Sequence, residues 1–479
     1  MKNFDIGLTY DDVLLVPQRS KIAHRSDVST KTKLSKNIDL NIPLISANMD
    51  TVTESPMAIA MAQNGGIGII HRFMGIEEEV WHVQKVKRFS GFIRYKPFII
   101  NENKTLKDIK ILIISSGVSS LIVVDDQEKV TGIISRRDML FVDDDKTPIK
   151  KLMTPFTKLV FAAPDITMEE AKVLLHKHKI EKLPLLDKDK KLNGLITARS
   201  LESFTNSPLS VKDRHGRLKV GAAVGVVGDF VERAKSLIEA GVDVLVVDVA
   251  HGHNEVALKG IETIRKKFKD IDLIGGNIAT PQGVDDLIKL GVDAVKVGIG
   301  PGGLCTTRIV AGVGIPQLTA VLEASKVAKK YKVPIIADGG TNYPGDIAKA
   351  LAAGASSCML AGWFAGADES PGGIIMRKGM KFKVHRGAAS FLAVADRKLE
   401  NDEIDDSRLN TVVPEGVEAL VPYKGMVKDV IFQLVGALRS GMSYCNAHSI
   451  RELWKNAQFV RITEAGFRES KSHNVEEIT

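Results

Sequence analysis

Cysteine and aromatic residues are scarce in this sequence. Its 479 residues include three cysteines, Cys305, Cys358 and Cys445, and aromatic residues amount to 5%. Because the cysteines are odd in number and far apart, we expect no disulfide framework and a reducing, cytoplasmic location. No block of basic residues is interleaved with aromatics, so nucleic acid is not an expected partner.

Long hydrophobic runs are also absent. No apolar stretch approaches the roughly 20 residues needed to cross a bilayer. The first residues show no basic start followed by an apolar run and a cleavage site, so no membrane association is expected. The net charge of 66 − 58 = +8 is modest, and an excess of positive charge suits anionic small molecules.

Short apolar segments alternate with amphipathic helical patterns along most of the chain. Eight expected strands cover residues 43–47, 66–70, 220–224, 244–248, 273–277, 294–298, 335–338 and 358–361. Near-continuous apolar strands are typical of parallel sheets buried on both faces. Eight βα units predict an α/β fold, a (β/α)8 TIM barrel built from residues 1–92 and 209–479.

The segment that interrupts the barrel contains an internal repeat. Residues 121–138 carry LIVVD and then VTGIISRRD, while residues 183–200 carry LPLLD and then LNGLITARS. Each copy reads as strand, turn, strand and helix. The repeat resembles a tandem pair of CBS domains (a Bateman module), with copies over residues 93–150 and 151–208.

That resemblance implies a regulatory site for an ATP- or GTP-type nucleotide. CBS domains often hold a ribose through the Asp that closes a Ser/Thr-x-x-Asp pattern. The first copy has this pattern from Ser135 to Asp138, whereas the second runs from Thr197 to Ser200 and lacks the Asp. One nucleotide site is therefore expected, and a purely structural pair is the alternative.

A glycine-rich turn follows the sixth expected barrel strand. Residues 296–308 read KVGIGPGGLCTTR. Backbone N–H groups of such a turn can face an anion, and the glycines allow close approach. A cysteine there, followed by two hydroxyls and a cation, is typical of a nucleophile beside a phosphate site. A buried cysteine in a loop is the alternative.

Polar residues and glycines follow the other strands, where barrel enzymes place their sites. Asp338 can accept hydrogen bonds from a ribose diol, and the glycines after the last two strands can cradle a phosphate. These strand ends predict a mononucleotide site with the Cys305 thiol aimed at the base. They carry Asn48, Asp248, Val249, Ala250, Asn277, Asp338, Gly339, Gly340, Ala361 and Gly362.

The chain resembles the IMP dehydrogenase/GMP reductase family over nearly its whole length. The matching motifs are LTYDDVLLVP at 8–17, NMDTVTE at 48–54, GPGGLCTTRIVAGVGIPQ at 300–317, VPEG at 413–416 and VPYKG at 421–425. The resemblance implies that a cysteine thiolate attacks C2 of a purine nucleotide. A dehydrogenase then passes hydride to NAD and hydrolyses the intermediate, whereas a reductase releases ammonia from GMP and takes hydride from NADPH.

The resemblance also implies roles for particular residues. Cys305 is the nucleophile in either enzyme. Thr307 and Glu415 match a pair that the reductases use for proton transfer around the leaving amine. Arg308 with the loop amides can lower the thiol pKa. The implied substrate site comprises Asn48, Gly302, Gly303, Asp338, Gly339, Gly340, Ala361, Gly362, His385, Gly387 and Glu415. The implied cofactor site comprises Asp248, Val249, Ala250, Asn277, Gly298 and Gly300. A K+ site would use backbone carbonyls of Gly300, Gly302 and Cys305, with Glu469 and Ser470.

Departures from the family pattern favour one of the two enzymes. Dehydrogenases carry an Arg-Tyr pair on a mobile flap, and residues 396–408, DRKLENDEIDDSR, contain none. Loss of a general base costs about 10²- to 10⁴-fold. We therefore expect an NADPH-dependent GMP reductase acting on GMP and IMP, a homotetramer or octamer. An IMP dehydrogenase using NAD and a non-catalytic nucleotide sensor are the alternatives.

Three further departures concern the phosphate. Gly303 and Gly362 stand where relatives often carry a serine, and His385 replaces an aromatic residue. His385 either takes over a phosphate contact, as a cation or donor, or merely packs.

Overall fold

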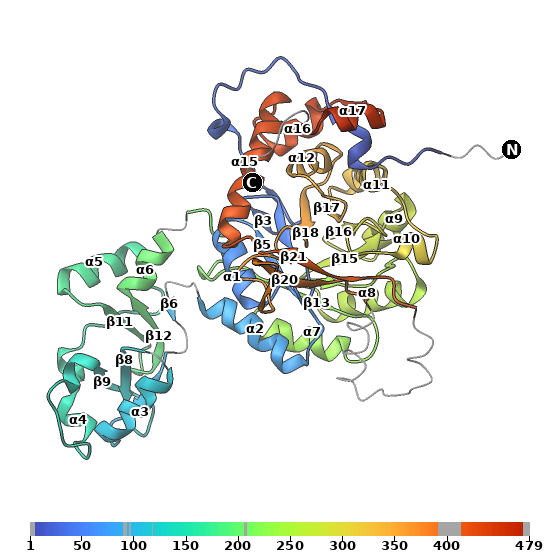
Figure 1. The fold of residues 1–479 in the computed structure, drawn as a ribbon. Helices are drawn as coiled ribbons and strands as arrows, with labels where there is room; N and C mark the ends of the chain where they lie inside the picture. Colours follow the sequence, from blue (N-terminus) through green and yellow to red (C-terminus); the bar gives the residue numbers. More distant parts are fainter. Residues whose placement is uncertain are drawn as a thin grey trace. The chain divides into compact units, whose positions relative to one another are not determined.

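The computed structural model describes residues 5–89, 93–94, 97–116, 118–205, 208–390 and 413–472. The chain forms two compact units (Figure 1). The larger comprises residues 1–87, 209–213 and 218–479, and the smaller comprises residues 88–208 and 214–217. Among the described residues, no helix is both long enough and apolar enough to cross a membrane.

The larger unit is a closed parallel barrel whose strands follow the order β13-β14-β15-β16-β17-β18-β4-β5. The strands are β4 (Leu44–Ser46), β5 (Ile67–Ile70), β13 (Gly221–Val224), β14 (Val244–Val247), β15 (Asp272–Ile278), β16 (Ala294–Val297), β17 (Ile335–Asp338) and β18 (Ser357–Leu360). All eight coincide with predicted strands, so the TIM-barrel prediction is confirmed. The bounds shift by at most one residue because hydrogen bonding, rather than apolar character, ends a strand.

Helices cover the outside of the barrel (Figure 1). They are α1 (Ser55–Gln63), α2 (Ile76–Phe89), α7 (Phe230–Glu239), α8 (Glu255–Lys267), α9 (Pro281–Lys289), α10 (Thr307–Val310), α11 (Gln317–Tyr331), α12 (Pro344–Ala352) and α15 (Val427–Tyr444). Their apolar faces bury one core against the strands, including Ala58, Leu237 and Leu434. A second core fills the barrel interior with side chains such as Ile69, Val246 and Ile336. Each strand is therefore buried on both faces, as parallel strands require.

A hairpin adds to the interior core. Strands β2 (Thr32–Lys33) and β3 (Asp39–Leu40) pair, and Leu34, Ile38 and Leu40 join the interior cluster. Ser35 and Asn37 in its turn donate hydrogen bonds to Asp272 at the start of β15. The hairpin thus lies against the N-terminal end of the barrel, which leaves the opposite end for the strand-end loops.

A three-stranded antiparallel sheet extends the chain after β18. It comprises β19 (Ile374–Arg377), β20 (Met380–Arg386) and β21 (Glu418–Pro422), in that order. Then α16 (Ile450–Asn456), β22 (Phe459–Arg461) and α17 (Glu464–Glu469) complete the described chain, and β22 pairs with β1 (Val13–Leu15). This antiparallel sheet is important for the site. Strand β20 carries His385, and Glu415 lies just before β21.

The smaller unit contains two sheets that exchange strands between the repeats. Its elements are β6 (Ile93–Arg94), β7 (Ile99–Asn101), α3 (Leu106–Ser116), β8 (Ser120–Val124), β9 (Val130–Ser135), α4 (Ile149–Leu152), β10 (Thr154–Pro155), α5 (Met168–His178), β11 (Lys182–Leu186), β12 (Leu192–Thr197) and α6 (Ala198–Thr205). The first sheet has the order β10-β9-β8-β7 and the second β11-β12-β6. The first strand of each copy, β6 or β10, therefore pairs with the other copy. Apolar side chains from both repeats, such as Val124 and Leu195, share one core.

Candidate active site

The cysteine loop joins β16 to α10. The Sγ atom of Cys305 lies 3.1 Å from the Thr307 hydroxyl oxygen, and the Cys305 side chain is half-buried. The Cys305 N–H donates to the Gly302 carbonyl at 3.0 Å, which closes the turn. Thr307 begins α10, so the helix fixes the spacing between thiol and hydroxyl. A reactive group with a proton-carrying hydroxyl beside it is the arrangement that covalent catalysis needs.

Backbone hydrogen bonds bring Glu415 to this loop across more than 100 residues of sequence. The Thr306 N–H donates to the Glu415 carbonyl at 2.8 Å, and the Val417 N–H donates to the Leu304 carbonyl at 3.0 Å. The Glu415 N–H in turn donates to the Ala389 carbonyl at 3.1 Å. The structure therefore brings the backbone of Glu415 beside the loop that carries Cys305 and Thr307.

The loop after β4 is held to the end of β20. Arg386 donates to the Asp50 carboxylate at 2.5 Å, and the Thr51 hydroxyl lies 3.1 Å from Nδ1 of His385. Asn48, which is buried, belongs to the same loop. Gly387 follows at once, and a side chain there would collide with Gly416 and the Leu304 carbonyl. Of these residues, Gly387 approaches the cysteine loop directly, at the Leu304 carbonyl.

Four strand ends share a buried polar network around Lys296. The Lys296 side chain is only 3% exposed, and its Nζ lies 2.8 Å from Oδ2 of Asp338 and 3.9 Å from Oδ1 of Asp248. Asn277 accepts a hydrogen bond from Lys296 and donates to Asp338 at 2.9 Å and to the Gly298 carbonyl at 2.8 Å. Burial alone would lower the pKa of Lys296, but the Asp338 and Asp248 carboxylates outweigh it and raise that pKa.

Sequence reasoning missed Lys296. Its signal was a single lysine inside an otherwise apolar strand, since residues 294–297 read AVKV and all four are buried. Lysine is almost never fully buried unless it is paired. A buried strand with one lysine could therefore have pointed to carboxylates at neighbouring strand ends as the partners of Lys296.

The glycines after β17 bring the cysteine loop close to that strand end. Gly339 has a φ of +89°, and a Cβ there would lie 3.0 Å from the Pro301 ring and 3.1 Å from the Gly302 nitrogen. Only glycine satisfies both the left-handed backbone and the close contact. Next to it, Ala361 and Gly362 follow β18 and end in a tight turn closed by Phe364. The loops after β17 and β18 are where TIM barrels bind phosphate.

His385 is buried and is a poor cation. Burial, with a further contribution from Lys424, lowers its pKa to about 4. The imidazole is therefore neutral near pH 7. Of the two roles considered for His385, the cationic contact with phosphate is disfavoured, and only a neutral donor or a packing role remains.

Acidification should lower the free energy of unfolding because His385 is buried in its neutral form. The unfolded chain binds a proton at His385 below about pH 6.5, whereas the folded chain resists until about pH 4, so stability falls as pH drops between these values. The difference corresponds to about 3 kcal/mol. Denaturant unfolding at pH 7.5 and pH 4.5 should show a smaller acid loss for His385→Asn than for the parent. An equal loss in both proteins would contradict this prediction.

Arg308 was predicted to act on the thiol, and Glu469 and Ser470 were predicted to join a K+ site at the cysteine loop. Arg308 donates to the Ile315 carbonyl at 2.5 Å and packs against Gly300 and Gly314, so its guanidinium braces the loop. Glu469 and Ser470 lie at the end of α17, which packs on the 3-10 turn at Tyr10–Asp12. In the described part of this single chain they are part of that contact rather than of the loop at Gly300.

Histidine and acidic side chains form no metal cluster in the described residues. Nε2 of His253 instead lies 2.8 Å from the Asp286 carboxylate.

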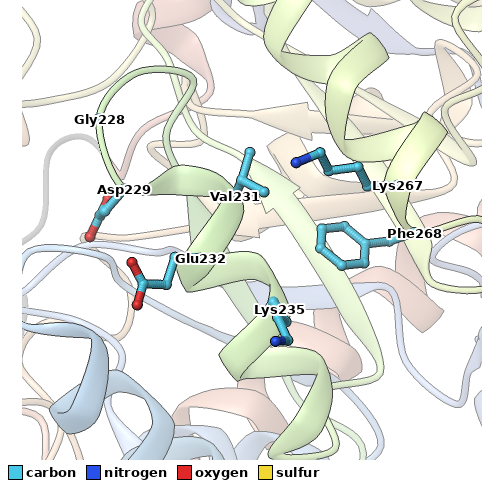
Figure 2. Close-up of a pocket in the computed structure, with 7 residues that line it drawn as sticks. All are labelled: Gly228, Asp229, Val231, Glu232, Lys235, Lys267 and Phe268. Carbon is cyan, nitrogen blue, oxygen red and sulfur yellow. The ribbon is translucent and has the colours of Figure 1, made fainter.

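A groove of about 600 Å³ runs between α7 and α8, lined by Asp229, Glu232 and Lys235 with Lys267 (Figure 2). None of the predicted site residues lines it, and its lining mixes both charge signs.

The chain matches a known family over nearly its whole length. The family model described as IMP dehydrogenase / GMP reductase domain matches residues 7–473. The chain belongs to the IMP dehydrogenase/GMP reductase family. It is therefore an enzyme of the nicotinamide-dependent purine-nucleotide oxidoreductases.

Several curated relatives at high identity are inosine-5'-monophosphate dehydrogenases. The inosine-5'-monophosphate dehydrogenase of Nitrosopumilus maritimus is 51% identical over 475 residues, which is 98% of this chain and 99% of the relative. The same enzyme of Aquifex aeolicus is 48% identical, covering 99% and 97%. That of Bacillus subtilis is 48% identical, covering 98% and 96%.

Solved structures of GMP reductase from Trypanosoma brucei are also similar. A cysteine-to-alanine variant in complex with guanosine 5'-monophosphate has a TM-score of 0.92 and 42% identity, covering 99% of both chains. A complex with guanosine 5'-triphosphate has a TM-score of 0.81 and 39% identity, covering 96% and 98%.

The expectation of a GMP reductase is wrong, because the curated relatives favour an IMP dehydrogenase. Full-length identity of 46–51% to IMP dehydrogenases exceeds the 39–42% to the reductase structures. That expectation depended on the missing Arg-Tyr pair at residues 396–408, which lie outside the described residues. Both enzymes build the same covalent intermediate, so one absent pair says little about the rest of the site.

The predicted regulatory residues form matching caps in the two repeats. Oδ2 of Asp138 accepts hydrogen bonds from the Ser135 N–H and hydroxyl, both at 2.7 Å. In the second copy Thr197 and Ser200 exchange hydrogen bonds of 3.0–3.1 Å. Both caps close locally, so Asp138 retains only its other oxygen for a ribose.

Proposed function

We propose that this protein is an IMP dehydrogenase, which oxidises IMP to XMP with NAD and water. The observation that carries the proposal is the Cys305–Thr307–Glu415 arrangement in a chain whose full-length curated relatives bear that name. Cys305 would attack C2 of IMP, and the C2 hydride would pass to NAD. Water would then release XMP and regenerate the thiol.

Side chains of this chain would hold the substrate as the family resemblance implies. Asp338 would accept the ribose hydroxyls, and Gly339, Gly340 and Gly362 would offer amides to the phosphate. Thr307, 3.1 Å from Sγ, is near enough to hold a proton beside the reacting carbon. With no Arg-Tyr pair on residues 396–408, we infer that Thr307 and Glu415 serve the attacking water.

Cofactors follow the same reasoning. NAD would lie beside Asp248, Val249, Ala250 and Asn277. Backbone carbonyls of Gly300, Gly302 and Cys305 suit a hard monovalent cation such as K+. Gly302 already accepts one hydrogen bond, and its second lone pair stays free. Glu469 and Ser470 would complete that cation site only from another copy of the chain.

Regulation and assembly are proposed from the family resemblance. An ATP- or GTP-type nucleotide would bind the CBS pair at Ser135 and Asp138, with Thr197 in the second copy. The reductase solved with guanosine 5'-triphosphate supports this, since it matches the chain over almost its whole length. A homotetramer, pairing into octamers, and a cytoplasmic location belong to the same proposal.

A paired turnover assay tests the function. Incubation with IMP and NAD should produce XMP and NADH in equal amounts, identified by chromatography and by absorbance. Incubation with GMP and NADPH should leave NADPH unchanged. Turnover in the second mixture alone, or in neither mixture while IMP still binds, would overturn the proposal.

A further inference from the structure

The proposed phosphate site gains few hydrogen-bond donors from residues 303, 362 and 385, the positions that often supply them in relatives. Neither Gly303 nor Gly362 has any atom within 4 Å of the place where a side chain would begin. Both glycines are exposed, so the space beside them is open. His385, the third position, is neutral near pH 7 and directs Nδ1 toward the Thr51 hydroxyl. A dianionic phosphate there would lack both the hydroxyls and a cation.

Lys424 brings an ammonium group to this space. Its Nζ lies 3.3 Å from the Gly362 carbonyl and 3.4 Å from the Trp363 carbonyl, and 4.9 Å from the centre of the Trp363 ring. Trp363 itself donates to the Thr341 carbonyl at 3.0 Å. The ammonium group is therefore fixed beside the loops that follow β17 and β18.

No carboxylate pairs with Lys424 among the described residues. Its two hydrogen bonds to carbonyls are long, and burial lowers its pKa. As a whole the residue stays exposed, so its ammonium can be reached from solvent. A partly desolvated cation beside an open, glycine-lined cradle is complementary to an anion.

Backbone pairing fixes the position of Lys424. Its N–H donates to the Gly366 carbonyl at 2.9 Å, and Gly425 bridges to Ala367 in parallel. The segment therefore follows the loop after β18 closely. A segment whose backbone is fixed in this way need not be ordered when a ligand binds.

We propose that Lys424 binds the 5'-phosphate of the purine nucleotide and compensates for the missing hydroxyls at residues 303 and 362. The inference rests on the proposed nucleotide site. It makes Lys424 a residue that distinguishes a nucleotide from its nucleoside. A charged hydrogen bond of this kind changes affinity by about 10- to 100-fold.

Binding measurements can test this without turnover. In a Cys305→Ala background, calorimetry with IMP and with inosine should show that Lys424→Met raises the Kd for IMP about 10- to 100-fold. The Kd for inosine should change less than about twofold, because inosine lacks the phosphate. Lys424→Arg should retain most of the IMP affinity. Lys381→Met is the matched control, since Lys381 lies 5.4 Å from the Tyr423 ring on the adjacent strand.

The outcomes separate the inference from the proposed function. Equal weakening of IMP and inosine by Lys424→Met would mean that the lysine only supports the loop, and would overturn the inference. An unchanged Kd for IMP would also overturn it. If the Cys305→Ala protein with Lys424 intact does not bind IMP at all, the proposed function fails and the inference fails with it.

Discussion

Replacement of Cys305 by alanine should abolish turnover of IMP by about 10⁴-fold or more while leaving IMP binding largely intact. The covalent intermediate cannot form without Sγ, and no other cysteine can substitute. Cys358 is buried in β18, where burial raises its pKa to about 12. Steady-state rates with IMP and NAD, together with calorimetric IMP binding, check the result.

Cys445→Ala is the matched control for the thiol. Cys445 is 1% exposed at the end of α15, and burial raises its pKa too. Its alanine variant should keep turnover, and iodoacetamide should label Cys305 alone in the parent protein. A Cys305→Ala enzyme with more than about 1% of the parent rate would rule out the covalent route.

Replacement of Lys296 by methionine should cost about 3–5 kcal/mol of unfolding free energy. The substitution keeps the length of the side chain but leaves the Asp338 carboxylate without its cation, while Asp248 keeps Arg72 at 3.8 Å. Because the pKa of Lys296 is raised in the fold, its stabilisation is fully present at neutral pH. It is lost only when the pH rises through that raised value. Chemical unfolding at pH 7.5 measures the loss.

A double variant separates charge from packing. Lys296→Met with Asp338→Asn should recover part of the lost stability, since one unpaired carboxylate is removed. It should not recover turnover, because Asp338 is the proposed ribose ligand. Lys235→Met, whose exposed partner is Glu239, should leave stability nearly unchanged. If Lys296→Met were as stable as Lys235→Met, the buried network would not matter to the fold.

Local chemistry in the sequence was enough for the barrel and the nucleophile. Eight short apolar runs gave the strands, and strand order in a βα repeat leaves few alternatives. The glycines around Cys305 indicated a turn that exposes a thiol beside a strand end. Such features are local in the sequence, so they can be recognised without knowledge of the tertiary contacts.

Other features depend on residues that only the fold brings together. The pairing of residues 415–417 with the cysteine loop, the burial that keeps His385 neutral and the position of Lys424 beside Gly362 all involve long-range contacts. The pairing of Lys296 is evident only from the fold, in which three neighbouring strand ends supply its partners. Sequence by itself determined the barrel, the thiol and the family. Tertiary structure decided which charges are paired, because the pairing of charges depends on distance and burial rather than on order along the chain.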